Sequence, residues 1–143
     1  MSNARFVFCE QRSRWAAWTG RHADLRSYEV QSLDECWDHL RVAPASLIVV
    51  ELTSCPIKPM IEFLVQVRER NPDGRVMVVG SRADCRFEWL LREAGAVAAF
   101  FDPRSAECLA RQAERHFASV PRDGESVEQQ IIDRLPWGDF AGS

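Results

Sequence analysis

Short apolar runs alternate with amphipathic segments five times along this chain of 143 residues. Each apolar run has five to seven residues, a length typical of strands, and the runs lie at 5–10, 25–30, 46–52, 75–80 and 97–101. The amphipathic segments carry the apolar spacing of helices and lie at 12–23, 32–42, 59–70, 84–94 and 105–120. Strands that alternate with helices favour a parallel sheet covered on both faces. The sequence therefore predicts an α/β domain.

Local signals at the ends of the segments support this division. Ser32 and Glu35 have the spacing of a capping box at the start of the second helix. Pro59 lies near the start of the third helix, where proline is tolerated, and Gly95 is well placed to end the fourth. The run 46–52 is continuously apolar, as a central parallel strand should be.

Composition narrows the class of protein. Hydrophobic residues make up 46% and charged residues 27%, which is typical of a globular domain, and the net charge of −3 gives no general attraction to nucleic acid. The longest apolar run, near 96–101, is too short to span a membrane. The five cysteines form no C-x-x-C pair, and no signal peptide precedes them. We expect free thiols, a cytoplasmic location, and neither nucleic acid nor membrane as a partner.

The segment 121–143 is predicted to be an extension outside the domain formed by 1–120. It opens with turn-forming residues and then offers a short helix at 126–135, ended by Pro136. Trp137 and Phe140 follow that helix, and aromatic residues often carry binding energy at protein interfaces. Three interpretations stay open: these residues anchor a partner, the extension folds back over its own domain, or its helix pairs with a second copy.

Three carboxylates follow predicted strands. Glu10, Glu51 and Asp102 each end or follow an apolar run, and the carboxyl ends of parallel strands meet at one edge of a sheet, where ligands commonly bind. Three acids there could hold a divalent cation through oxygen ligands. With 17 arginines in the chain, we favour ion pairing instead. His22, His39 and His116 have no metal-ligand spacing with any cysteine, and no phosphate-binding glycine loop is present, so we predict neither metal nor cofactor.

Three stretches, in order along the chain, carry a resemblance to a known family. They are "ARFVFCEQ" at 4–11, "RVMVVGSRAD" at 75–84 and "REAGAVAAFFDP" at 92–103. Over about residues 4–119 the chain resembles the receiver domain of bacterial response regulators. The resemblance implies a flavodoxin-like (βα)5 three-layer sandwich with a five-stranded parallel sheet, to which the sequence adds a short C-terminal helical tail.

The resemblance also implies a phosphorylation pocket, and this sequence departs from it at nearly every position. Glu10 and Gln11 match the pair of acids that holds Mg²⁺, and Glu51 matches the aspartate that accepts the phosphoryl group. Gly80 matches the position of the hydroxyl, with Ser81 one residue later, and Asp102 matches the lysine. A phosphoryl dianion on Glu51 would lie beside Asp102, and like charges a few ångströms apart repel by on the order of a few kcal/mol. We therefore predict a degenerate pocket with no catalytic residue.

The expected function is that of a non-catalytic bacterial signalling module that binds another protein or a second copy of itself. The resemblance implies an interface formed by 84–94, 97–101 and 105–120, on which Arg92 and Arg111 are predicted to be exposed. Trp15, Trp18, Trp37 and Trp89 lie at helical spacings, which favours core packing for all four.

Alternatives remain for the pocket. An arginine or lysine could replace the missing lysine and keep phosphorylation possible, and the candidates are Arg12, Lys58, Arg82 and Arg104. The acidic strand ends could instead sense an ion or a small molecule. Glu51 itself is expected to be a solvated carboxylate that caps nearby amides, with a permanently active, phosphate-like role as the competing interpretation.

Overall fold

The computed structural model describes residues 4–52 and 55–120, which form one layered α/β unit. The strands are β1 (Phe6–Cys9), β2 (Ser27–Val30), β3 (Leu47–Glu51), β4 (Arg75–Val79) and β5 (Ala98–Phe100). The helices are α1 (Arg14–Gly20), α2 (Leu33–Val42), α3 (Ile57–Arg70), α4 (Glu88–Ala94) and α5 (Ala106–Ser119). The predicted order of strands and helices and the flavodoxin-like three-layer fold are confirmed.

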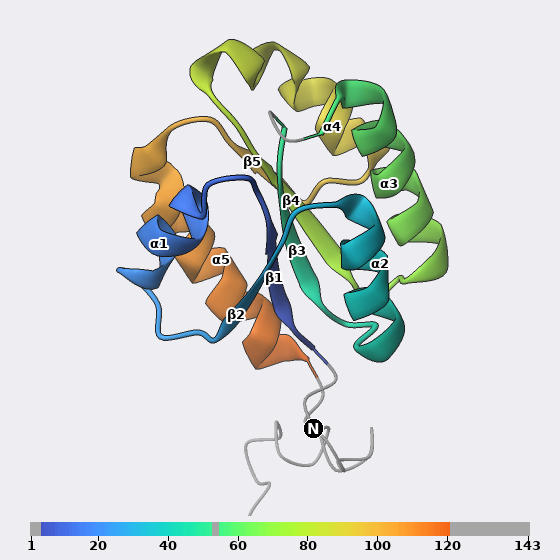
Figure 1. Ribbon diagram of the computed structural model, residues 1–143, viewed down its shortest axis with the longest axis horizontal. Coiled ribbons are helices and arrows are strands. Elements are labelled where there is room, and N and C mark those ends of the chain that lie inside the picture. Colours follow the sequence, from blue (N-terminus) through green and yellow to red (C-terminus); the bar gives the residue numbers. More distant parts are fainter. Residues whose placement is uncertain (1–3, 53–54, 121–143) are drawn as a thin grey trace, which may run out of the picture.

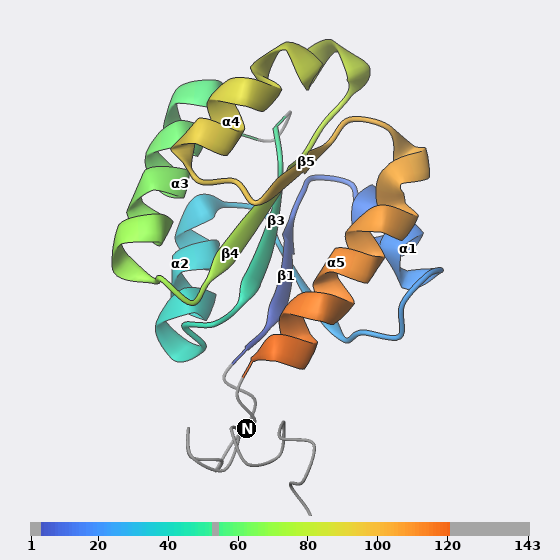
Figure 2. The same cartoon turned by 180° about the vertical axis from the view of Figure 1, so that it is seen from behind.

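The strands form one parallel sheet in the order β2-β1-β3-β4-β5. All five residues of the central strand β3 are buried, because helices cover both faces of the sheet. Figure 1 shows α2, α3 and α4 on one face and α1 and α5 on the other, and Figure 2 shows the same layers from behind. Successive side chains of a strand alternate between the two faces, so Val7 packs towards α2 while Phe8 packs towards α5.

Two helix ends follow the predicted signals. The Ser32 hydroxyl accepts a hydrogen bond from the Glu35 backbone N–H at 3.3 Å, which confirms the cap of α2. Gly95 ends α4 with a φ of 129°, a conformation that favours glycine. The predicted helix at 84–94 is divided, since a 3-10 helix at Arg82–Phe87 precedes α4.

One prediction about the tryptophans is wrong. Trp15 is buried, and Trp18 and Trp37 are partly buried against the two core clusters, but 74% of Trp89 is exposed. Consecutive helical residues point about 100° apart, so Leu91 and Trp89 project to nearly opposite sides of α4. Leu91 occupies the buried side, which leaves Trp89 in solvent.

The described residues allow a comparison for the cysteines, but not for the predicted C-terminal extension. All five cysteines are free thiols, with Cys85 and Cys108 exposed. The helix predicted at 126–135, Trp137 and Phe140 lie outside the described residues, and the boundary at 120 stays a prediction. Within the described ranges, no helix is long and apolar enough to cross a membrane.

Candidate functional site at the carboxyl edge of the sheet

The carboxyl ends of β1, β3, β4 and β5 lie at one edge of the sheet, the upper edge in Figure 1. A cavity of about 200 Å³ opens there. Of the six residues predicted for the degenerate pocket, Glu51, Gly80 and Ser81 line this cavity. The full lining is Arg14, Trp15, Trp18, Glu51, Gly80, Ser81, Arg82, Phe101 and Pro103.

Glu10 is used as a helix cap. Its side chain is buried, and its two carboxylate oxygens accept hydrogen bonds from the backbone N–H groups of Trp15 and Ala16, both at 2.9 Å. These amides belong to the first turn of α1, where N–H groups have no partner within the helix. Burial raises the pKa of Glu10, although the two N–H bonds act in the opposite direction. Gln11, predicted beside it as the second member of the pair, is exposed.

Glu51 is buried and bound to an arginine. Arg14 Nη2 donates to Glu51 Oε2 at 3.2 Å, and Glu51 is only 3% exposed. The expectation of a solvated carboxylate is therefore wrong, because residues of α1 and of the loop after β4 line the cavity together with Glu51. The guanidinium of Arg14 therefore places a positive charge beside this carboxylate at the end of β3.

The loop after β4 uses its polar groups internally. Asp84 Oδ2 accepts hydrogen bonds from the Ser81 backbone N–H at 2.9 Å and from the Ser81 hydroxyl at 3.1 Å. A Cβ atom added to Gly80 would lie 2.7 Å from the same Asp84 oxygen. A hydroxyl-bearing residue at position 80 would therefore displace Asp84, so the glycine there belongs to the local structure of the turn.

Asp102 also has an internal cation. Arg82 Nη2 lies 3.0 Å from Asp102 Oδ2, and Asp102 Oδ1 accepts a hydrogen bond from the Arg104 backbone N–H at 3.0 Å. That N–H bond, followed by the Arg82 contact, lowers the pKa of Asp102. Arg82 was one of the four predicted substitute cations, and the expected pairing of acids with arginines is confirmed for Glu51 and Asp102.

Sequence reasoning missed Arg14 and the role of two tryptophans. Arg14 follows Glu10 by four residues, and the start of a helix so close to a strand end was the available signal that it could reach the sheet edge. Trp15 and Trp18 pack against each other, with ring centroids 5.2 Å apart, and also line the cavity. Helical spacing correctly indicated packing for both but not that they form a wall of the site.

No group of three or more histidine, cysteine or acidic side chains is arranged to hold a metal ion among the residues that the structure describes. Glu51 at the cavity and Asp102 after β5 are instead paired with guanidinium groups from the first turn of α1 and from the loop after β4. The site therefore presents two ion pairs beside a small, mostly apolar recess with aromatic walls.

Comparison with known proteins places this arrangement on a familiar fold. No model of a protein family and no curated protein matches the sequence. Among solved structures, a response regulator from Thermotoga maritima superposes with a TM-score of 0.66 at 18% identity, covering 83% of this chain and 100% of that one. A CheY-like protein (tadZ) from Pseudomonas aeruginosa PAO1 gives 0.63 at 19% identity over 85% of this chain and 98% of the other. A putative pilus assembly protein (cpaE) from Burkholderia thailandensis gives 0.56 at 15% identity over 80% and 99%.

These likenesses define the fold. The chain has the fold of CheY-like receiver domains, as the resemblance of the three sequence stretches implied. The sequence identities are below 20%, so the chemistry of the site has to be argued from its own residues.

Proposed function

We propose that this chain is a receiver-like regulatory module that acts by binding protein and does not accept a phosphoryl group. The observation that carries the proposal is the Arg14–Glu51 contact at 3.2 Å. In a phosphorylatable receiver a metal ion and a lysine would offset the charge that builds on the phosphoryl oxygens. Here the cation bound to Glu51 is the side chain of Arg14. The position that matches the lysine carries Asp102.

The hydrogen bonds of the site support the same proposal. Glu10 has both carboxylate oxygens on backbone amides of α1, so metal binding there would compete with the cap of the helix. The Ser81 hydroxyl is bonded to Asp84, which leaves it less available to a phosphoryl oxygen. The acids and the hydroxyl predicted for the pocket thus have partners within the chain, and these residues are Glu10, Glu51, Ser81 and Asp102.

Tryptophan fluorescence tests the loss of phosphorylation chemistry. Trp15 and Trp18 line the cavity, so occupation of the site should change their emission. We expect no saturable change when the full chain is titrated with Mg²⁺ and then with beryllofluoride, which imitates an acyl phosphate. A phosphorylatable receiver serves as the positive control.

A saturable change that requires both Mg²⁺ and beryllofluoride, and that Glu51→Gln abolishes, would show that the pocket still works. Arg82 would then be the cation to examine as the replacement for lysine, since it already lies 3.0 Å from Asp102. A response to Mg²⁺ alone would instead support an ion-sensing role.

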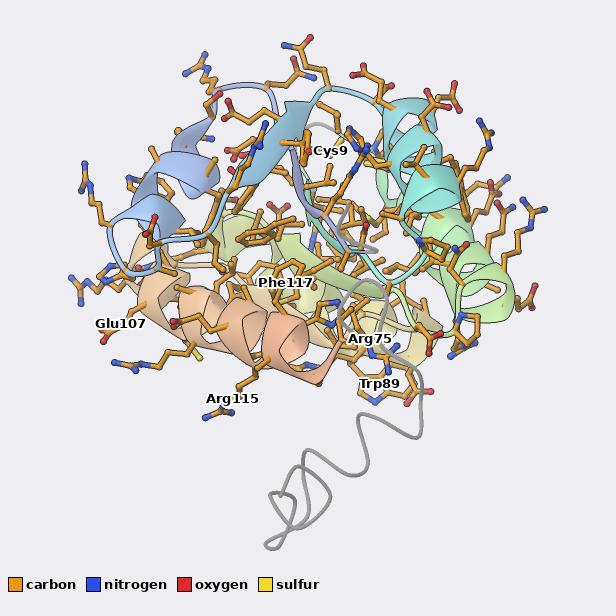
Figure 3. The ribbon with its side chains drawn as sticks, turned by 90° about the horizontal axis from the view of Figure 1, so that it is seen from below. Cys9, Arg75, Trp89, Glu107, Arg115 and Phe117 are labelled. Atoms are coloured by element: carbon orange, nitrogen blue, oxygen red, sulfur yellow. The ribbon has the colours of Figure 1, made fainter. Side chains whose placement is uncertain are left out.

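The proposed binding surface consists of α4, β5 and α5. Trp89 is 74% exposed on α4, and Val97, just before the edge strand β5, is 43% exposed. Figure 3 shows Trp89 and Arg115 on the same side of the molecule. An exposed tryptophan is a typical centre of binding energy at an interface, and a second copy of the chain is the partner we propose to test first.

Charged residues on this surface offer a test that leaves the fold intact. Arg92 pairs with Glu88 at 3.2 Å and Arg111 pairs with Glu107 at 2.9 Å, both as exposed pairs one helical turn apart. Such pairs contribute about 0.3–0.5 kcal/mol. Each reversal loses one attractive pair and creates a repulsive glutamate pair one turn apart, so we expect Arg92→Glu or Arg111→Glu to lower the stability measured in urea by no more than about 1 kcal/mol. If the surface is the interface, self-association measured by sedimentation weakens in either variant, and unchanged association in both contradicts this proposal.

A further inference from the structure

A second recess lies at the opposite, amino-terminal edge of the sheet. It has a volume of about 410 Å³, within the range of small-molecule sites, and more of its surface is apolar than polar. Figure 3 looks onto this edge and shows Phe117 extending from α5 towards the sheet. The lining comes from the starts of β1 and β2 and the end of α5, and consists of Ala4, Arg5, Phe6, Leu25, Arg26, Tyr28 and Phe117.

Aromatic and aliphatic side chains form the apolar part of the recess. The rings of Phe6 and Phe117 meet edge to face, with centroids 5.6 Å apart at 60°. Leu25 packs against the same cluster from the loop before β2. Rings and a branched side chain around one hollow suit a flat hydrophobic body.

Two arginines give the recess a single sign of charge. The guanidinium carbons of Arg5 and Arg26 lie 5.1 Å and 5.8 Å from the centroid of the Tyr28 ring. The lining contains no carboxylate, and within 4–52 and 55–120 no ion pair involves either arginine. Two neighbouring cations without a carboxylate create a field that favours an anion.

Arg5 is held in place before any ligand arrives. Its Nη1 donates to His39 Nδ1 at 3.0 Å, and the His39 ring lies 5.0 Å from the Tyr28 ring. A guanidinium has five N–H donors, so stacking on Tyr28 and one bond to His39 leave others to meet an oxyanion. Because the arginine is already ordered, binding loses less side-chain entropy.

A larger cavity near this recess does not share its preference for anions. It measures about 550 Å³, and its lining carries both Asp73 and Arg75, so it offers both signs of charge. His116 in that lining is bonded through Nε2 to the Ala45 carbonyl at 2.7 Å. Of these two cavities, the recess around Tyr28 is the one that combines apolar walls with cations and has no carboxylate in its lining.

We propose that the recess formed by Arg5, Arg26, Tyr28 and Phe117 binds a small organic anion with a flat apolar body. The body packs between Phe6, Leu25 and Phe117, and the anionic group meets the two guanidinium groups. This site is separate from the cavity at the carboxyl edge and does not depend on whether Glu51 can be phosphorylated.

The chain provides a natural probe, because Tyr28 is its only tyrosine. Full-length protein labelled with 3-fluorotyrosine reports on this recess through one labelled position in ¹⁹F NMR. We expect naphthalene-2-sulfonate, at constant ionic strength, to shift that signal in a saturable way. Sulfate, which has the charge without the body, and 2-naphthalenemethanol, which has the body without the charge, should each bind at least about tenfold more weakly.

Arg26→Gln tests the role of the cations. Arg26 is exposed, so the fold should persist, and loss of one charge-assisted contact should weaken naphthalene-2-sulfonate binding by about tenfold. Arg41→Gln is the matched control, since Arg41 is exposed and pairs with Asp38 on α2, outside the recess. No saturable shift in the wild type, equal affinity in Arg26→Gln, or an equal loss in Arg41→Gln would each overturn the proposal.

Discussion

Glu10→Ala should lower the free energy of unfolding at pH 7 by about 2 kcal/mol. The substitution removes both oxygens that accept from Trp15 N–H and Ala16 N–H. The alternative cap is weak, because the residue before α1 is Ser13, which has a φ of 52° and makes no side-chain cap bond. Trp15 is buried, so water cannot readily replace the lost acceptor. Urea denaturation followed by circular dichroism measures the change.

The raised pKa of Glu10 predicts how the stability of the protein changes with pH. Burial raises its pKa in the folded protein above the ordinary value of 4.5. The folded state then binds the proton more tightly than the unfolded state, so protonation of Glu10 contributes stability that is fully present below pH 4.5 and is lost as the pH rises through the folded pKa. This contribution is separate from that of the two cap hydrogen bonds, which Glu10→Ala removes. Glu10→Gln cannot ionise. The stability of the wild type relative to Glu10→Gln should therefore fall as the pH rises above about 4.5.

Gln11→Ala is the neighbouring control for both experiments. Gln11 is exposed, and such a substitution should change stability by less than about 0.5 kcal/mol. If Glu10→Ala is as mild as Gln11→Ala, the cap is not the role of Glu10. A stability difference from Glu10→Gln that stays constant between pH 4 and 8 would contradict the raised pKa.

Trp89→Ala should weaken self-association about thirtyfold while leaving the folded monomer intact, which corresponds to about 2 kcal/mol of binding free energy. The side chain is 74% exposed, so little core packing is lost with it. On association an indole of this size can bury a large apolar area, which is why tryptophan dominates many interfaces. Sedimentation equilibrium measures the dissociation constant, and the urea midpoint of the monomer checks the fold.

Val42→Ala is the matched control for that experiment. Val42 is another exposed apolar residue, with 61% of its surface accessible. It is the last residue of α2, which does not belong to the proposed surface of α4, β5 and α5. Self-association should be the same in Val42→Ala as in the wild type. A wild-type chain that stays monomeric at 100 µM, or a Trp89→Ala chain that associates as the wild type does, would rule out self-association through α4, β5 and α5.

The fold was largely predictable because the spacing of apolar residues shows which side of each strand or helix is buried. The layers of the fold pack against one another through these buried sides. The strand 46–52 was found within two residues, since β3 is buried on both faces and needs a continuous apolar run. Trp89 was placed wrongly because Trp89, Leu90 and Leu91 are consecutive apolar residues, and sequence alone does not say which of them occupies the buried stripe. The 3-10 turn at Arg82–Phe87 adds to the difficulty, because it changes the rotation per residue just before α4.

The site was predictable in its positions and less so in its contacts. Glu51, Gly80 and Ser81 were brought together because strand order and direction determine which loops meet. The partners of the acids depend on side chains that cross between elements, such as Arg14 from α1 to the end of β3. Arginine is long and the chain has 17, so its identity gave no indication of which carboxylate each one would reach.

The two internal ion pairs have a consequence for how such a module would be controlled in a cell. If the site does not accept a phosphoryl group, as proposed, the module has no phosphorylation cycle to reset and needs no phosphate donor or phosphatase. Under the proposed function, the variable that a partner senses is the number of copies present relative to its own. Control then passes to synthesis and degradation, and the response becomes a matter of stoichiometry and of competition for one exposed face.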